Sequence, residues 1–256
     1  MVCSCRYRVL DFNSSVQSRR PVIIAHRGAS KAKRENTLEA FEAAIEMGAD
    51  AIEFDVRRTR DGVYVVHHDP AVASSDTLIA DSNYIDIDNL ARKQGFHIPT
   101  LEEALSACQG RIGLNIELKE EGYEGDVVPF IRERVEAASA VITSFNDNSV
   151  KQTASAWPEV RTGLILGVDS PASVRTRISE LFPENRLRRC GADFVAAHHR
   201  LIRFGFLKRM LSAGYPVWVW TVDDPARTRA LIRQGASGII TNVPDQLRGI
   251  CGKTAY

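Results

Sequence analysis

The sequence has few of the features that mark secreted, membrane-spanning or nucleic-acid-binding proteins. Its five cysteines are an odd, scattered set in 256 residues, which argues against a disulfide framework and for reduced thiols in a compartment such as the cytoplasm. No apolar run approaches the roughly 20 residues that a membrane-spanning helix needs. The formal net charge is +1, so we expect no nucleic-acid partner. What remains is an ordinary globular composition with enough chain for a large core.

The sequence also has no Gly-x-Gly-x-x-Gly segment after a strand, the usual mark of a dinucleotide site. Instead, short apolar runs alternate with amphipathic stretches from Val22 onward. This α/β pattern predicts a parallel sheet, and eight strands are the number that closes a TIM (β/α)8 barrel, with an open doubly wound sheet as the alternative. The predicted strands are 22–27, 51–58, 112–119, 140–145, 160–166, 192–198, 216–222 and 237–241.

The predicted domain organisation is simple. We expect residues 1–20 to form a flexible N-terminal extension, and residues 21–256 to form a single barrel domain. After the second strand, Asp61-Gly62 predicts a hairpin turn, so that this strand folds back on itself. Residues 70–97 then form a polar insertion with little periodicity, which we expect to lie over the rim of the barrel.

Helix-capping patterns lie between the strands. Asn36 can cap a first helix with Glu39 in the capping-box position, and Thr100 with Glu103 has the same spacing at another helix start. Later helices are predicted near residues 126–138, 147–156, 201–213 and 225–234.

Two predicted strands carry charged residues on one face. Side chains alternate along a strand, so Glu53 and Asp55 share a face, as do Asn115, Glu117 and Lys119 on the next barrel strand. In a barrel the apolar faces meet the outer helices. The charged faces therefore point inward, near the carboxyl ends of adjacent strands.

Three carboxylates in one such mouth need compensating charge, because buried like charges oppose ionisation. A divalent cation is the simplest compensation, and oxygen ligands favour Mg²⁺ or Ca²⁺. The alternative is a structural ion network with Arg27, Arg57 and Lys119.

Histidines end two of the strands that bracket these carboxylates. His26 and His68 are candidate proton carriers, since imidazole titrates near neutral pH. His67 has the opposite strand parity and is expected to be structural. Arg27 supplies a forked cation that suits a phosphate.

Later strands offer candidates for a substrate wall. Trp218 and Trp220 share a parity, and Trp220 is nearer the carboxyl end of its strand. We expect Trp220 to line the mouth and Trp218 to fill the core. For His198 and His199, a wall and plain packing are equally open.

Several short motifs follow one another in a specific order. They are His26-Arg27-Gly28, Glu35-Asn36-Thr37, Glu53-Phe54-Asp55-Val56, Asp61-Gly62, His68-Asp69-Pro70, Ile116-Glu117-Leu118-Lys119 and Trp220-Thr221-Val222. This order, from Val22 to the C-terminus, resembles that of the glycerophosphodiester phosphodiesterase family. The resemblance implies a TIM barrel that hydrolyses a glycerophosphodiester to glycerol 3-phosphate and an alcohol, with a bound Mg²⁺ or Ca²⁺.

The resemblance also implies roles for individual residues. The implied metal ligands are Glu53, Asp55 and Glu117; the acid/base pair is His26 and His68; phosphate- or substrate-binding residues are Arg27, Lys119, Glu35 and Trp220. The implied partner is a small phosphodiester, and a homo-oligomer is left open.

The chain departs from the family pattern in three places. Asn242 stands where an aspartate usually follows the threonine of the last strand, Ala32-Lys33-Arg34 replaces a segment ending in proline, and the 70–97 insertion is short. These departures leave the substrate open. Alternatives are a lysophospholipase D-type activity on lysophospholipids, or a barrel that binds phosphate esters without turnover.

Overall fold

The strands close into a barrel. The computed structural model describes residues 10–12, 21–72, 75–167 and 174–251. Within these residues, eight parallel strands pair in the order β1-β9-β8-β7-β6-β5-β4-β2, and β1 pairs with β2 to complete the circle. The strands are β1 (Val22–His26), β2 (Ala51–Arg58), β4 (Gly113–Leu118), β5 (Ala140–Ser144), β6 (Arg161–Leu166), β7 (Phe194–His198), β8 (Val217–Trp220) and β9 (Gly238–Thr241). The predicted TIM barrel is confirmed, and the doubly wound alternative is wrong.

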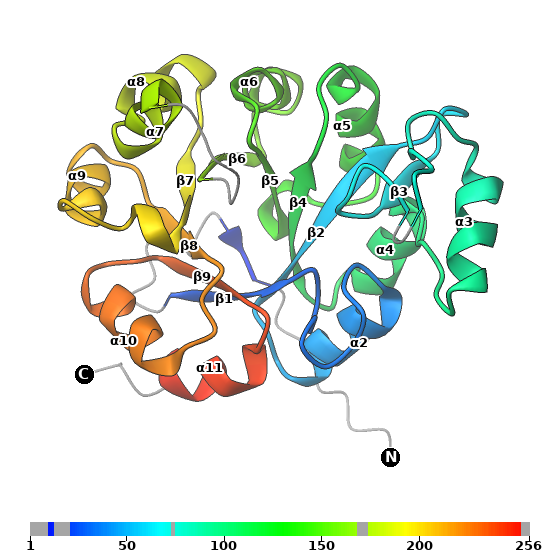
Figure 1. Ribbon diagram of the computed structural model, residues 1–256. Coiled ribbons are helices and arrows are strands. Elements are labelled where there is room, and N and C mark those ends of the chain that lie inside the picture. Colours follow the sequence, from blue (N-terminus) through cyan, green and yellow to red (C-terminus); the bar gives the residue numbers. More distant parts are fainter. Residues whose placement is uncertain (1–9, 13–20, 73–74, 168–173, 252–256) are drawn as a thin grey trace.

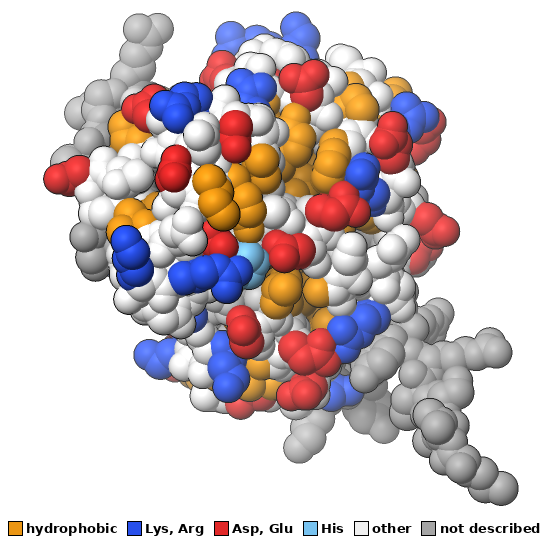
Figure 2. Space-filling model, turned by 90° about the vertical axis from the view of Figure 1, so that its right-hand side faces the viewer, with side chains coloured by type: hydrophobic (Ala, Val, Ile, Leu, Met, Phe, Trp, Pro, Cys, Tyr) orange, Lys and Arg blue, Asp and Glu red, His pale blue; other side chains and the backbone are white. Residues whose placement is uncertain are grey.

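Helices between the strands surround this barrel (Figure 1). They are α2 (Leu38–Glu46), α3 (Tyr84–Lys93), α4 (Leu101–Cys108), α5 (Glu124–Arg132), α6 (Asp147–Ala156), α7 (Val174–Leu181), α8 (Glu184–Cys190), α9 (Phe206–Ser212), α10 (Pro225–Arg233) and α11 (Pro244–Cys251). The sequence did not predict α3, α7, α8 or α11. Acidic and basic side chains are interspersed on the face that Figure 2 shows.

Strand parity divides β2 as expected. Ile52, Phe54 and Val56 belong to the apolar layer between the strands and the outer helices, where the Phe54 ring lies 5.6 Å from that of Phe41. The alternate residues of β2 face the barrel axis. This alternation positions the carboxylates of the strand inside the mouth.

The strand register then brings functional residues side by side. His26 of β1 pairs with Glu53 of β2, and Asp55 of β2 pairs with Glu117 of β4. His26 is the last residue of β1 and Glu117 lies next to the last residue of β4, so the strand register places Glu53 and Asp55 at the carboxyl ends of their neighbouring strands, the end at which barrel sites are built.

The opposite end of the barrel is closed by a residue from the predicted extension. Phe12 is 1% exposed, and its ring lies 5.8 Å from that of Trp218. Trp218 in turn packs against Phe194 at 4.3 Å, so its predicted core position is confirmed. Phe12 of the predicted extension thus packs against the barrel, whereas residues 1–9 and 13–20 lie outside the described residues, and the flexible extension stays a prediction.

We expect Phe12→Ala to lower the free energy of unfolding by about 3–5 kcal/mol, because it leaves a cavity at the closed end of the barrel. Urea unfolding followed by circular dichroism measures this effect. Phe204, which is 80% exposed, provides the matched control, and its replacement by alanine should cost less than about 0.5 kcal/mol. Equal losses of unfolding free energy in the two variants would contradict the conclusion that Phe12 closes this end of the barrel.

The predicted hairpin is present, and the insertion after it is better ordered than expected. The strand β3 (Tyr64–Val66) pairs antiparallel with β2. Helix α3 then forms inside the insertion, with Ile87 and Ala91 buried in a small cluster of its own. The spacing Tyr84, Ile87, Ala91 follows one helix face, so the expectation of little periodicity is wrong here.

The two predicted helix caps had different outcomes. At α4, Thr100 and Glu103 form the complete capping box, which confirms that prediction. At α2 the cap is Thr37, whose hydroxyl accepts the backbone N–H of Ala40. The Asn36 prediction is wrong because the Asn36 amide is bonded elsewhere, to Asp55.

Two of the cysteines, Cys108 and Cys190, are free and buried. Among the described residues, no helix is long and apolar enough to cross a membrane. The cytoplasmic location stays a prediction, and a homo-oligomer stays open.

Candidate active site

Three acidic side chains meet at the mouth of the barrel. Glu53, Asp55 and Glu117 each offer a carboxylate oxygen within 4.8 Å of the others, and they are only 3%, 1% and 7% exposed. Their assembly follows from strand parity and from the β2–β4 register. The predicted clustering of the three carboxylates is confirmed.

The donor set of this triad fits a hard divalent cation. Glu53 Oε1 and Asp55 Oδ1 are buried and have no hydrogen-bond partner among the described residues, although Asp55 Oδ1 lies 3.2 Å from Lys119 Nζ. Buried oxygens of this kind normally have partners. A ligand set made only of oxygens favours Mg²⁺ or Ca²⁺.

Two cations border the triad. Lys119 Nζ donates to Glu117 Oε1 at 2.6 Å, and Arg27 Nε lies 3.3 Å from Asp55 Oδ2. The Arg27 guanidinium also donates to Glu35 at 2.8 Å. Arg27 and Lys119 thus stand beside the carboxylates, where a phosphate bound at the triad would meet them.

The balance of burial and charge separates the three carboxyl groups. Burial, reinforced by Asp55, raises the pKa of Glu117 to about 7, and burial likewise raises the pKa of Glu53 well above its usual range. Burial also opposes ionisation of Asp55, but Lys119 and Arg27 outweigh it and lower the pKa of that group. The two cations thus lower the pKa of Asp55 but do not offset the effect of burial on Glu53 and Glu117, and a further positive charge would favour ionisation of both.

The loop after β1 brings its backbone close to the triad. The N–H of Arg27 donates to Glu53 Oε2 at 2.9 Å, and Arg27 has a φ of 57°. Gly28 follows with a φ of 81°, and a Cβ there would lie 2.7 Å from Ala40, so only glycine lets this loop lie against α2. Left-handed backbone at a non-glycine residue is a conformation that functional sites often retain.

Asn36 contacts the carboxylates of the mouth and does not cap α2, the role that the sequence pattern predicts for it. Its Nδ2 donates to Asp55 Oδ2 at 2.7 Å, and it is 3% exposed. The motif Glu35-Asn36-Thr37 indicates that this segment belongs to the site, whereas the spacing of Asn36 and Glu39 predicts a helix cap.

His26 lies on the inward face of β1, where its Nδ1 is 2.8 Å from Asn242 Oδ1. Burial, and then the charge of Arg27, lowers the pKa of His26 to about 4. The ring is therefore neutral near pH 7, the form that can accept a proton.

His68 lies after the hairpin, with Nδ1 2.8 Å from Asp69 Oδ1. Burial lowers its pKa, although the nearby Asp55 carboxylate opposes that shift. Arg57 holds this segment, because its guanidinium donates twice to the carbonyl of His68 and once to Glu120. Arg57 thus supports the loop that carries His68. The sequence predicts Arg27, Arg57 and Lys119 as possible ion partners of the triad, and of these Arg27 and Lys119 contact it.

Aromatic side chains form another wall of the mouth. The Trp220 ring lies 5.8 Å from Phe145 and 4.8 Å from His198, with edge-on geometry in both pairs. Its indole N–H donates to the carbonyl of Ala196, which fixes the ring. Lys119 Nζ lies 5.7 Å from the Phe145 ring, so this wall is continuous with the charged part of the site.

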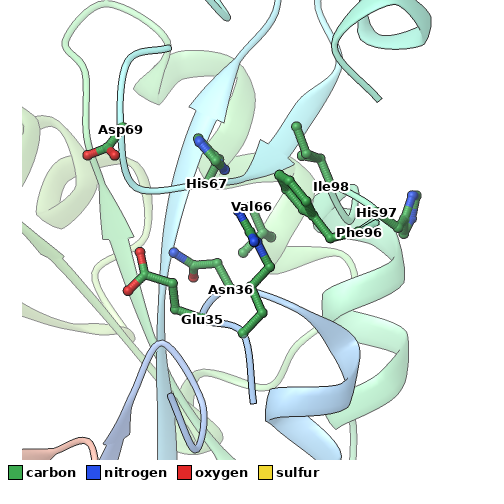
Figure 3. Close-up of a pocket in the computed structure, with 9 residues that line it drawn as sticks. Glu35, Asn36, Val66, His67, Asp69, Phe96, His97 and Ile98 are labelled. Atoms are coloured by element: carbon green, nitrogen blue, oxygen red, sulfur yellow. The ribbon is translucent and has the colours of Figure 1, made fainter. Parts of the chain in front are cut away.

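A cavity of about 290 Å³ adjoins the mouth on the side of the insertion. Figure 3 shows Glu35 and Asp69 on one side and Phe96 and Ile98 on the other. His67 lies between them and contacts the carbonyl of Ala71. The site therefore has an apolar wall and, beside the carboxylates, a cavity with both polar and apolar lining.

Comparison with known proteins agrees with this fold. Residues 26–246 match the Glycerophosphoryl diester phosphodiesterase family. A glycerophosphodiester phosphodiesterase of Caldanaerobacter subterraneus subsp. tengcongensis is 29% identical over 254 residues, covering 91% of this chain and 98% of that protein. A lysophospholipase D of Mus musculus is 25% identical over 266 residues, covering 88% of this chain and 80% of that protein.

A solved phosphodiesterase structure has a similar fold. A phosphodiesterase from Oleispira antarctica, in complex with the product sn-glycerol-3-phosphate, superposes with a TM-score of 0.77 at 25% identity, covering 91% of this chain and 98% of that one. The protein is thus a barrel enzyme of the phosphoric diester hydrolase class. It belongs to the glycerophosphodiester phosphodiesterase family, as the motif order predicts.

Proposed function

We propose that this protein hydrolyses glycerophosphodiesters to sn-glycerol 3-phosphate and an alcohol, with a divalent cation held by Glu53, Asp55 and Glu117. The observation that carries the proposal is the buried carboxylate triad with unpartnered oxygens, bordered by two cations and lying in a mouth with two histidines. The bound sn-glycerol-3-phosphate of the Oleispira antarctica relative supports the product class.

The cations of the chain would bind and orient the phosphate. A diester carries one negative charge, and attack at phosphorus adds negative charge on its oxygens. Arg27 and Lys119 can donate to those oxygens from opposite sides of Asp55. A divalent cation, when bound at the triad, supplies further electrostatic stabilisation of the same charge.

The two histidines would move the protons. One imidazole takes a proton from the nucleophile, which is either water or the glycerol 2-hydroxyl, as a new P–O bond forms. The other imidazole gives a proton to the alkoxide as the P–O bond to the alcohol breaks. If the nucleophile is the 2-hydroxyl, this step leaves a cyclic phosphate; water then gives up a proton and bonds to phosphorus, and the P–O bond to the 2-oxygen breaks as that oxygen takes a proton, which yields glycerol 3-phosphate. The lowered pKa values of His26 and His68 support the accepting role, and the diester anion favours the protonated form of a nearby ring.

The organic parts of the substrate would lie on the two sides of the triad. The Trp220–Phe145 wall offers apolar surface, and the cavity beside Glu35 and Asp69 offers polar partners on that side. Glu35 would serve both the substrate and the phosphate-binding cation, because it lines the cavity and also accepts a hydrogen bond from Arg27.

A second candidate function is a lysophospholipase D-type activity on lysophospholipids. The observation that favours it is the 25% identity to the mouse lysophospholipase D over most of both chains. It uses the same chemistry and differs only in the acyl chain on the glycerol.

We expect the purified enzyme with Mg²⁺ or Ca²⁺ to release glycerol 3-phosphate from one or more of glycerophosphocholine, glycerophosphoethanolamine and glycerophosphoglycerol. Coupled oxidation of glycerol 3-phosphate measures this release, and mass spectrometry detects lysophosphatidic acid from lysophosphatidylcholine in a parallel reaction. Lysophosphatidic acid alone would favour the second function. Binding of the diesters by calorimetry without either product would contradict hydrolysis.

A further inference from the structure

A chain of hydrogen bonds runs away from His26 behind the site. His26 Nδ1 is 2.8 Å from Asn242 Oδ1, and the Ser30 hydroxyl donates to the same oxygen at 2.9 Å. At the other end of the amide, Asn242 Nδ2 donates to Asp223 Oδ2 at 2.8 Å. Asp223 Oδ1 accepts the Asn242 backbone N–H at 2.8 Å and the Thr241 hydroxyl at 3.0 Å.

These bonds fix the direction of the Asn242 amide. An ionised carboxylate only accepts hydrogen bonds, so the group that faces Asp223 Oδ2 must be the donating NH₂ of the amide. The amide oxygen is therefore turned toward His26 and Ser30. Because Asp223 is itself held by two other donors, it keeps the amide from flipping.

The amide direction in turn decides which ring nitrogen of His26 carries hydrogen. An amide oxygen cannot donate, so the Nδ1 that faces it must be the N–H. In the neutral ring the lone pair is then on Nε2.

We propose that Asp223 and Asn242 are positioning residues that hold His26 as the Nδ1–H tautomer, so that Nε2 exchanges the catalytic proton. The proposal rests on the proposed acid/base role of His26. The Asp223 carboxylate does not contact the His26 imidazole. The neutral Asn242 amide lies between them, and Asp223 orients His26 by orienting that amide.

Exchanging the two groups tests this arrangement, because the single and the double changes have opposite expected effects. Asn242→Asp places two carboxylates face to face where Nδ2 and Oδ2 are now 2.8 Å apart. Asp223→Asn places two NH₂ groups face to face, and turning the Asn242 amide to relieve this would present a donor to His26 Nδ1. The double variant Asp223→Asn/Asn242→Asp restores one donor and one acceptor at every contact.

The direct measurement is the ¹⁵N NMR spectrum of the histidine rings in the Mg²⁺-loaded enzyme, with the His26 signals assigned by their loss in His26→Gln. The wild type should give the Nδ1–H tautomer, and Asp223→Asn should shift His26 toward Nε2–H. Finding Nε2–H in the wild type would overturn the proposal, whether or not the Asp223 and Asn242 variants fold.

Kinetics provide the second arm. Each single variant should lose about 10²-fold in kcat with KM changed less than about threefold, and the double variant should recover to within about tenfold of wild type. A wild-type kcat in Asp223→Asn, or a double variant as slow as the product of the two single losses, would overturn the positioning role. Full activity in His26→Gln would instead refute the proposed function, and the NMR result would still stand on its own.

Discussion

Replacing His26 or His68 by alanine is expected to lower kcat for glycerophosphodiester hydrolysis by roughly 10²- to 10⁴-fold in each case. His26 of β1 pairs in register with Glu53, and the charge of Asp55 acts on the pKa of both His26 and His68. Each would serve a different bond, one formed and one broken, so loss of either stops the turnover. Steady-state assays of glycerol 3-phosphate release measure the effect.

The matched control is His67→Ala, one residue before His68. The His67 ring contacts the carbonyl of Ala71 and does not bond to the triad, so its loss should reduce kcat by less than about tenfold, or 1.4 kcal/mol. Circular dichroism and thermal unfolding would check that all three variants are folded. Folded His26→Ala and His68→Ala proteins with full activity would contradict the assignment of these residues.

Replacing a single carboxylate of the triad is expected to abolish activity while stabilising the metal-free protein. Glu53→Gln removes one ligand and should weaken Mg²⁺ or Ca²⁺ binding by at least about 100-fold, more than changes around a ligand usually do. The same change removes a buried group whose ionisation burial and Asp55 oppose, so the metal-free variant should unfold at a higher temperature than the metal-free wild type. Calorimetry with the metal and thermal unfolding without it measure the two effects.

Opposite signs in these two experiments distinguish a metal site from a structural network. If the triad served only to pair with Arg27 and Lys119, Glu53→Gln would leave metal affinity unchanged and destabilise the protein. Asp126→Asn is the control, because Asp126 is exposed and its contact with Arg58 is long, at 3.8 Å. It should change neither quantity.

The pH dependence of metal binding follows from the raised pKa of Glu117. In the metal-free protein this carboxyl group is largely protonated below its pKa of about 7, and a carboxylate must lose its proton to bind a cation. Affinity should therefore rise between pH 6 and pH 8, with protons released on binding. Calorimetry in two buffers of different ionisation enthalpy would detect this release, and a flat affinity over that range would contradict it.

The sequence was sufficient to predict the barrel and the triad, because both depend on short periodic patterns. Alternation along β2 and β4 determines which faces carry Glu53, Asp55 and Glu117, and parallel strands align their carboxyl ends. Trp218 and Trp220 share a parity, and only the position of Trp220 nearer the carboxyl end of the strand predicts that it lies at the mouth while Trp218 lies in the core. Periodicity therefore carries most of the information on the site.

Contacts between distant segments could not be predicted in this way. Asn36 looks like a helix cap from its neighbours, yet its partner is Asp55 on another strand. Asn242 stood out only as a departure from the family pattern, and its bonds to His26 and Asp223 need the closed barrel. Phe12 packs against Trp218, which lies far from it in the sequence, and no local pattern predicts this contact.

The most direct test is the rate of glycerol 3-phosphate release from a glycerophosphodiester after complete removal of divalent cations and after their return. We expect the wild type to lose activity on chelation and to recover it with Mg²⁺ or Ca²⁺. We expect no recovery of Asp55→Asn with either ion. Undiminished hydrolysis by the chelated wild type would contradict the proposal that the buried triad holds a metal ion for phosphodiester hydrolysis.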